Sequence, residues 1–252
     1  MHRRAFVGAL GALGLAQAAT TDNRTHFYVV EHMKLKNGTE LPRLHEFFSQ
    51  TLLPALNRIH TGPKIYLEAM IASHTPQLTV VYGFSSLEEM WGLHTKVMQD
   101  EAIAKSMQAL EASEPAFEAL DSSLLEAADF SPEIKLEPAA APHMFELRVY
   151  HAPTWRQLGF LLDRFRGPEI KIFHRVGIHP VLYGTTVIGA NSPNLVYLIP
   201  FADLAAREKA WNAFNADPEW QKVRKESIDR GGQLVTANDI AVFKATPYSP
   251  IR

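Results

Sequence analysis

Three polar side chains alternate along one expected strand and could do chemistry together. Glu146, Arg148 and Tyr150 occupy every second position, so a strand places them on one face and the apolar residues between them on the other. A carboxylate, a guanidinium and a phenol in a partly dry cavity could bind an anionic or phenolic ligand, with Tyr150 or Glu146 moving a proton. The alternative interpretation is a Glu–Arg pair that satisfies its own charges within a contact between domains.

The first half of the chain offers weaker candidates for the same work. Its matching strand face carries Tyr28, Val30 and His32, of which only His32 titrates near neutral pH. We therefore take Tyr28 and His32 as further candidate ligand-binding residues. The sequence has no cysteine and no His-x-His or His-Glu-x-x-His spacing, so we expect no metal site.

Composition bounds the class of protein. The chain has 252 residues, of which 46% are apolar and 21% charged, as in a soluble globular protein. The formal net charge is -2, and no basic stripe with stacking aromatics is present, so nucleic-acid binding is not expected.

The N-terminus has the pattern of an export signal. Arg3 and Arg4 precede a short apolar run, and Ala16 to Ala18 gives the small residues that signal peptidase reads. The arginine pair followed by Phe6 resembles a bacterial twin-arginine signal, with an ordinary Sec signal as the alternative. We expect residues 1–18 to be removed, the mature protein to be periplasmic or secreted, and no stable membrane span to remain.

An internal repeat organises the remainder. The segment from Leu78 to Phe84 recurs from Leu195 to Phe201 at an offset of 117 residues, and the segment from Leu124 to Phe130 recurs from Leu234 to Ile240 at an offset of 110. The repeat predicts two copies of one domain, over residues 26–131 and 144–246. The proline-punctuated segment 132–143 is the expected linker.

Hydrophobic periodicity gives both halves the order β-α-β-β-α-β. Strands are expected over 27–35, 64–73, 78–84, 124–130, 144–151, 181–188, 195–201 and 234–243. Helices are expected over 41–52, after Ser86 (with Glu89 as its capping-box partner), over 100–114, 155–165 and 204–214, and after Asp217. This order predicts two ferredoxin-like domains, an α+β fold in which each sheet has helices on one face.

The open faces of two such sheets should cover each other and form an α+β barrel within one chain. We expect the apolar face of the strand 144–151 to meet the helices and its polar face to point into the barrel. Because the chain supplies its own partner sheet, a monomer is plausible, although exposed outer strands could join two chains into a homodimer.

A family resemblance enters at the segment from Phe145 to Tyr150. It resembles the opening motif of the NIPSNAP family, an aromatic residue followed by Glu-Leu-Arg and a second aromatic residue. Further agreement comes from Arg175, Arg207 and the Asp-Pro-Glu-Trp run that begins at Asp217. The first half resembles a diverged copy.

The resemblance implies the dimeric α+β barrel superfamily, which includes cofactor-free monooxygenases and haem enzymes. It makes His174 a weak candidate haem ligand, although no cofactor is expected. Family members often carry a His and a Trp in the third strand, where this sequence has Leu198 and Pro200.

Three functions are compatible with these patterns. The first is an exported protein that binds a small apolar or aromatic molecule in the barrel. The second is a cofactor-free or haem-linked oxygenase. The third is a protein-interaction module without a pocket, in which Phe84, Trp91 and Phe201 would fill the interior. Whether the protein is an enzyme is left open.

Overall fold

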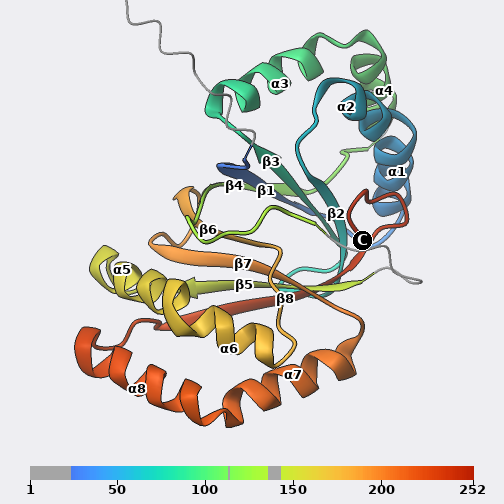
Figure 1. The fold of residues 1–252 in the computed structure, drawn as a ribbon. Coiled ribbons are helices and arrows are strands. Elements are labelled where there is room, and N and C mark those ends of the chain that lie inside the picture. The colour runs from blue at the N-terminus through green and yellow to red at the C-terminus, as the bar shows by residue number, and fades with distance from the viewer. Residues whose placement is uncertain (1–23, 113, 136–142) are drawn as a thin grey trace, which may run out of the picture.

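The two halves of the chain repeat one arrangement of strands and helices (Figure 1). The computed structural model describes residues 24–112, 114–135 and 143–252. The predicted export signal, residues 1–18, lies outside the described residues, as does most of the predicted linker 132–143. Both stay predictions.

In the first half, four strands alternate with two helical segments. The strands are β1 (Phe27–Lys34), β2 (Lys64–Ile71), β3 (Gln77–Phe84) and β4 (Ala119–Ala127). The first helical segment consists of α1 (Glu40–Phe47), the π-helical turn η1 (Phe48–Leu52) and α2 (Leu53–Ile59). The second consists of α3 (Leu87–Gln99) and α4 (Glu101–Glu111).

The second half has the same elements in the same order. The strands are β5 (Met144–His151), β6 (Leu182–Ile188), β7 (Asn194–Phe201) and β8 (Ala237–Ala245). The helical elements are α5 (Trp155–Arg164), η2 (Phe165–Glu169), α6 (Ile170–Arg175), α7 (Leu204–Ala216) and α8 (Pro218–Gly231). The predicted α+β fold with two ferredoxin-like repeats is confirmed.

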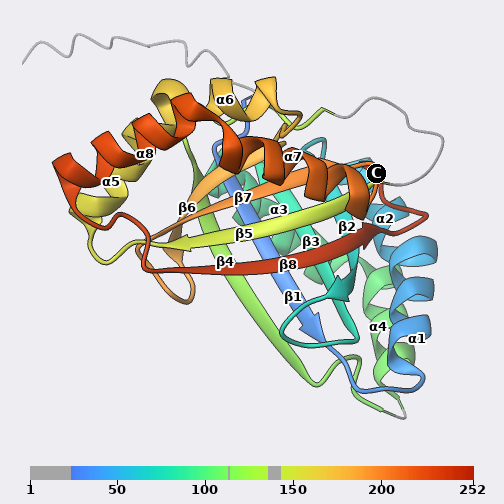
Figure 2. The ribbon, with the colours of Figure 1, turned by 90° about the horizontal axis from the view of Figure 1, so that it is seen from below.

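All eight strands close into one barrel in the order β1-β3-β2-β8-β5-β7-β6-β4. The halves join at two antiparallel seams, β2 with β8 and β4 with β6. The helices of each half lie outside the barrel, on opposite sides (Figures 1 and 2). Each of the eight described strands has a neighbour on both sides, so the expected exposed outer strands are not there to join two chains.

The strand register corrects one of the two repeat offsets. Phe27 faces Phe84 in one half and Met144 faces Phe201 in the other, which gives an offset of 117. For the last strand, Phe27 faces Glu126 and Met144 faces Lys244, so β4 and β8 are related by 118 residues rather than 110. The predicted similarity of 124–130 to 234–240 is therefore coincidental, and both last strands were placed partly out of position.

The predicted helix starts are confirmed by their capping contacts. The Ser86 hydroxyl accepts a hydrogen bond from the Glu89 backbone N–H at 3.1 Å, while the Glu89 carboxylate accepts one from the Ser85 backbone N–H. Asp217 accepts one from the Trp220 N–H at 3.0 Å, and Pro218 occupies the first position of α8.

The two faces of β5 are the reverse of the prediction. Phe145 and Leu147 point into the barrel, where they pack with residues of both halves such as Tyr28 and Val196. Tyr150 packs instead under the helices of its own half. Both faces of β5 are mostly buried, so the alternation of polar and apolar residues could not show which face meets which layer.

The structure also relocates the aromatic side chains expected to fill the barrel. Phe84 and Phe201 belong to clusters that pack under the helices. Trp91 is on the surface of α3, with 68% of its area exposed, and stacks on His94.

Within the described ranges, no helix is long and apolar enough to cross a membrane, and no group of three His, Asp or Glu side chains could hold a metal ion.

Candidate functional site

The predicted polar triplet meets the helical layer of the second half rather than the barrel interior. Glu146 is fully buried and accepts hydrogen bonds from three donors. Arg148 Nε contacts one of its oxygens, and Arg207 Nε contacts the other. The Trp211 indole N–H also reaches this second oxygen, at 3.3 Å. The carboxylate is therefore occupied by two cations and one indole.

Arg148 links this carboxylate to the rest of the site. Its guanidinium carbon lies 3.6 Å from the centre of the Trp211 ring, a cation–π contact. Its Nη1 donates to the Tyr150 hydroxyl at 3.3 Å. Burial raises the pKa of the Tyr150 phenol, and the charge of Arg148 opposes that rise only in part, so Tyr150 stays protonated at neutral pH.

A second buried ion pair stands beside the first. Arg164 on α5 donates from Nε to the Glu169 carboxylate at 2.7 Å and from Nη1 to the Ser227 hydroxyl at 3.3 Å. Its guanidinium carbon is 5.0 Å from the centre of the Trp220 ring. Burial raises the pKa of Glu169, with Arg164 opposing the rise. The contacts of Arg164 with Ser227 and Trp220 link α5 to α8.

The arginines of these two networks, together with Tyr150, Trp211 and Trp220, line an open cleft of about 720 Å³ between β5, β8 and the helices α7 and α8. Four arginines line it, namely Arg148, Arg164, Arg207 and Arg224. Only two carboxylates, Glu146 and Glu169, pair with them, so the cleft carries an excess of two positive charges. Arg224 is exposed and has no ion-pair partner within the described part of the chain.

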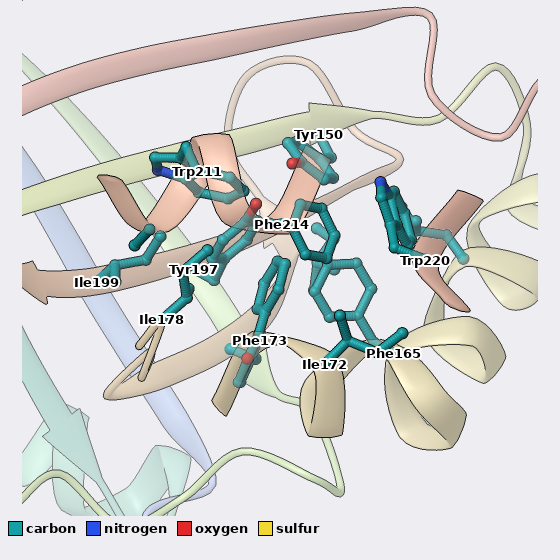
Figure 3. Close-up of a cluster of buried hydrophobic side chains, with 14 of the residues drawn as sticks. Tyr150, Phe165, Ile172, Phe173, Ile178, Tyr197, Ile199, Trp211, Phe214 and Trp220 are labelled. Carbon is teal, nitrogen blue, oxygen red and sulfur yellow. The ribbon is translucent and has the colours of Figure 1, made fainter. Parts of the chain in front are cut away.

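Aromatic rings form the inner wall of this cleft. Figure 3 shows Tyr150, Trp211, Phe214 and Trp220 converging between the sheet and the helices. The Phe214 and Trp220 rings are 4.3 Å apart, and Phe214 lies 5.7 Å from Trp211. Flat apolar rings near the unpaired guanidinium of Arg224 suit a planar molecule that carries an anionic group.

The first-half candidates lie elsewhere, along the inside of the barrel. His32 lines a second hollow of about 820 Å³ at one end of the barrel, together with apolar residues of both halves. Tyr28 lies deeper, fully buried, with its hydroxyl 3.4 Å from that of Ser131. Burial raises the pKa of Tyr28 to about 12, and the side chain does not line the hollow. The structure thus separates the predicted set of five residues between two places.

His174 does not fit the role of a haem ligand. It is exposed at the end of α6 and stacks on His179 with a centroid distance of 4.9 Å. It lines neither the cleft nor the barrel hollow. Burial and the neighbouring His179 lower its pKa.

Sequence reasoning missed the helix residues that complete the cleft. Arg207 and Trp211 are four residues apart on α7, and Trp220 and Arg224 are four residues apart on α8, so each pair shares one helix face. Comparison of the two repeats gives a signal that could have found them. The arginines and tryptophans occur only in the second half, since the first-half residues at an offset of 117 are Met90, His94, Ile103 and Met107.

Comparison of the sequence with models of known protein families gives a match in the second half of the chain. Residues 145–250 match the NIPSNAP family model. The second half is a NIPSNAP domain. The match includes the strands and helices that build the cleft. The first half lies outside the match, so its origin as a diverged NIPSNAP copy stays a prediction. No curated protein matches the sequence.

Solved structures share the fold across both described halves, including the half that precedes the NIPSNAP domain. A candidate monooxygenase from Fusobacterium nucleatum is similar with a TM-score of 0.57 and 11% identity, over 88% of this chain and 93% of that one. A candidate monooxygenase from Lactobacillus acidophilus gives 0.56 and 10%, over 88% and 94%. An anthrone oxidase-like protein gives 0.54 and 13%, over 88% and 92%. At these identities the likeness concerns the fold alone.

Proposed function

We propose that the NIPSNAP half of this protein binds a small aromatic molecule that carries a carboxylate or another anionic group. The excess of two positive charges in the aromatic-walled cleft is the observation that carries the proposal. Arg224 would face the anion, since Arg148, Arg207 and Arg164 already donate to Glu146 and Glu169. Trp211 and Trp220 would stack on the ring.

This assignment keeps the predicted ligand class but moves the site. The triplet was expected to orient a ligand inside the barrel, whereas Arg148 and Tyr150 line the cleft under α7 and α8. Glu146 supports the site by holding two arginines in place. Its oxygens already accept three hydrogen bonds, so it is poorly placed to take a proton from a ligand.

The test uses 2-naphthoate as the probe and isothermal titration calorimetry as the measurement. Arg224→Gln removes one unpaired guanidinium and should weaken binding about three- to tenfold, the effect of losing a partly solvated charge-assisted hydrogen bond. Arg58→Gln, a matched loss of charge on the exposed surface of α2, should leave the affinity unchanged. Equal affinity of wild type and Arg224→Gln would refute the site.

Oxygenase chemistry is the second candidate function. The positive charge of the cleft and the protonated Tyr150 could stabilise a phenolate or enolate, the electron-rich form of a substrate that O₂ oxidises. The fold shared with candidate monooxygenases and an anthrone oxidase-like protein motivates a trial with anthrone. O₂ uptake that depends on anthrone and falls at least tenfold in Tyr150→Phe would support it. No uptake above the buffer rate would leave binding as the function.

Export of the protein, by a twin-arginine or a Sec route, is part of the same proposal. Its support is the sequence pattern of residues 1–18 alone. The cleft is built entirely from residues 146–238, so the binding proposal does not depend on the export route.

A further inference from the structure

The hollow at one end of the barrel differs from the cleft in both lining and charge. It has a volume of about 820 Å³, within the range of small-molecule sites. Its inner part is apolar and draws on both halves, with Val30, Leu125, Leu147, Val196 and Phe243 in one buried cluster. An apolar molecule that entered the hollow would be surrounded by two facing sheets.

His32 is one of the polar residues that line the hollow beside its apolar part. Its Nδ1 lies 2.9 Å from the Thr79 hydroxyl and 3.2 Å from the Gln77 amide nitrogen. An amide nitrogen can only donate, so Nδ1 accepts and the neutral ring carries its proton on Nε2. Burial lowers the pKa of His32, which keeps the ring neutral. In the described part of the chain, Nε2 has no hydrogen-bond partner.

The charges around the mouth disfavour an anion. Lys34 is held by Asp121, with 2.5 Å between Nζ and Oδ2. Asp239 also lines the hollow, and its Oδ2 lies 2.9 Å from Nε2 of His151. The lining therefore has one lysine against two carboxylates and no unpaired cation, unlike the cleft under α7 and α8.

We propose that this barrel hollow is a second binding site, for a neutral apolar molecule with one carbonyl or hydroxyl group that accepts a hydrogen bond from His32 Nε2. The apolar part of the molecule would contact Leu147, Val196 and Phe243. The proposal rests on the hollow and on the Gln77–Thr79–His32 contacts, and it is independent of the anionic ligand proposed for the cleft.

The test uses a neutral probe matched in ring to 2-naphthoate. We expect 2-acetonaphthone to bind the full chain saturably and to shift the imidazole ¹⁵N resonances of His32 while those of the exposed His174 stay fixed. In His32→Leu the ketone should bind roughly two- to tenfold more weakly, the loss of one hydrogen bond, whereas 2-ethylnaphthalene, which lacks the carbonyl, should bind about equally to both proteins.

A second variant fills the hollow without touching His32. Ala241 lines it from β8, and Ala241→Leu should weaken ketone binding at least tenfold while naphthoate binding is unchanged. Arg224→Gln should have the opposite selectivity, which separates failure at one site from failure at the other. The proposal is overturned if the ketone does not bind saturably, if it binds without moving the His32 resonances, or if the two probes compete.

Discussion

The two helical layers of this protein cover equivalent sheets with opposite chemistry. In the second half, Glu146, Arg148 and Arg207 form a buried charge network between β5 and α7. The positions 117 residues earlier are Val29, Glu31 and Met90. At the same offset, the second half has Arg164, Trp220 and Arg224. The corresponding residues of the first half are Phe47, Ile103 and Met107.

This difference separates what the fold requires from what a site requires. Both halves have the same strands, the same π-helical turn and the same register, so the charges are not needed to build the architecture. The first half fills its layer with apolar side chains, as burial favours. The second half therefore contains a buried charge network that the architecture does not need, and the proposed binding role would account for it.

The largest effect is expected when the halves are separated. A fragment of residues 144–252 loses the sheet that covers Phe145, Leu147 and Phe243, and it should not persist as a folded monomer. We expect a homodimer in which β6 of one copy pairs with β8 of the other, in place of the seams with β4 and β2. Analytical ultracentrifugation with circular dichroism measures this. A folded monomer would mean that the half does not need a covering sheet.

Removal of the central carboxylate should produce the next largest effect. Glu146→Gln leaves two guanidiniums without their shared anion, one of them buried, and should lower the free energy of unfolding by about 3–5 kcal/mol. Urea denaturation measures the change. Glu126→Gln, at an exposed position on β4, is the matched control and should change stability by less than about 0.5 kcal/mol. Similar values for both would show that the network is not a buried unit.

The smallest change in stability is expected at Glu31. It is the one acidic residue among the first-half positions compared above. Burial raises its pKa, and it makes no hydrogen bond or ion pair with the described residues. Since its folded-state pKa lies above the unfolded value, its ionised form destabilises the fold above that pKa, and the penalty disappears as the pH falls below the ordinary glutamate value.

Glu31→Gln should therefore stabilise the protein at pH 7, by up to about 1 kcal/mol. The difference from wild type should shrink when urea denaturation is repeated near pH 4, because other carboxylates contribute equally to both proteins. An advantage that is independent of pH would assign the effect to packing rather than to charge.

The sequence predicted the architecture well and the location of the site poorly. Hydrophobic periodicity and the repeat from Leu78 to Leu195 were enough for the element order and for the covering of one sheet by the other. The last strands were displaced because a local similarity at Leu124 and Leu234 outweighed the register, which only the pairing with β1 and β5 reveals.

The site was misplaced for a physical reason. A strand buried on both faces gives no sign of which face meets helices, and a buried Glu–Arg pair is stable wherever its partners are. Arg207 and Trp211 provide those partners from α7, and contacts over such a sequence separation cannot be read from spacing within one strand. Likewise, Tyr28 and His32 share a strand face, but only His32 reaches the hollow.

The closed barrel of a single chain has a consequence for stoichiometry. Two identical copies around one barrel axis would present every inward-facing side chain twice, whereas here the counterpart of His32 is Val149. The imidazole thus occurs once per barrel. The ligand proposed for the hollow could form that hydrogen bond in only one orientation, because the wall around it is different on its two sides. One ligand per chain is the outcome that this asymmetry favours.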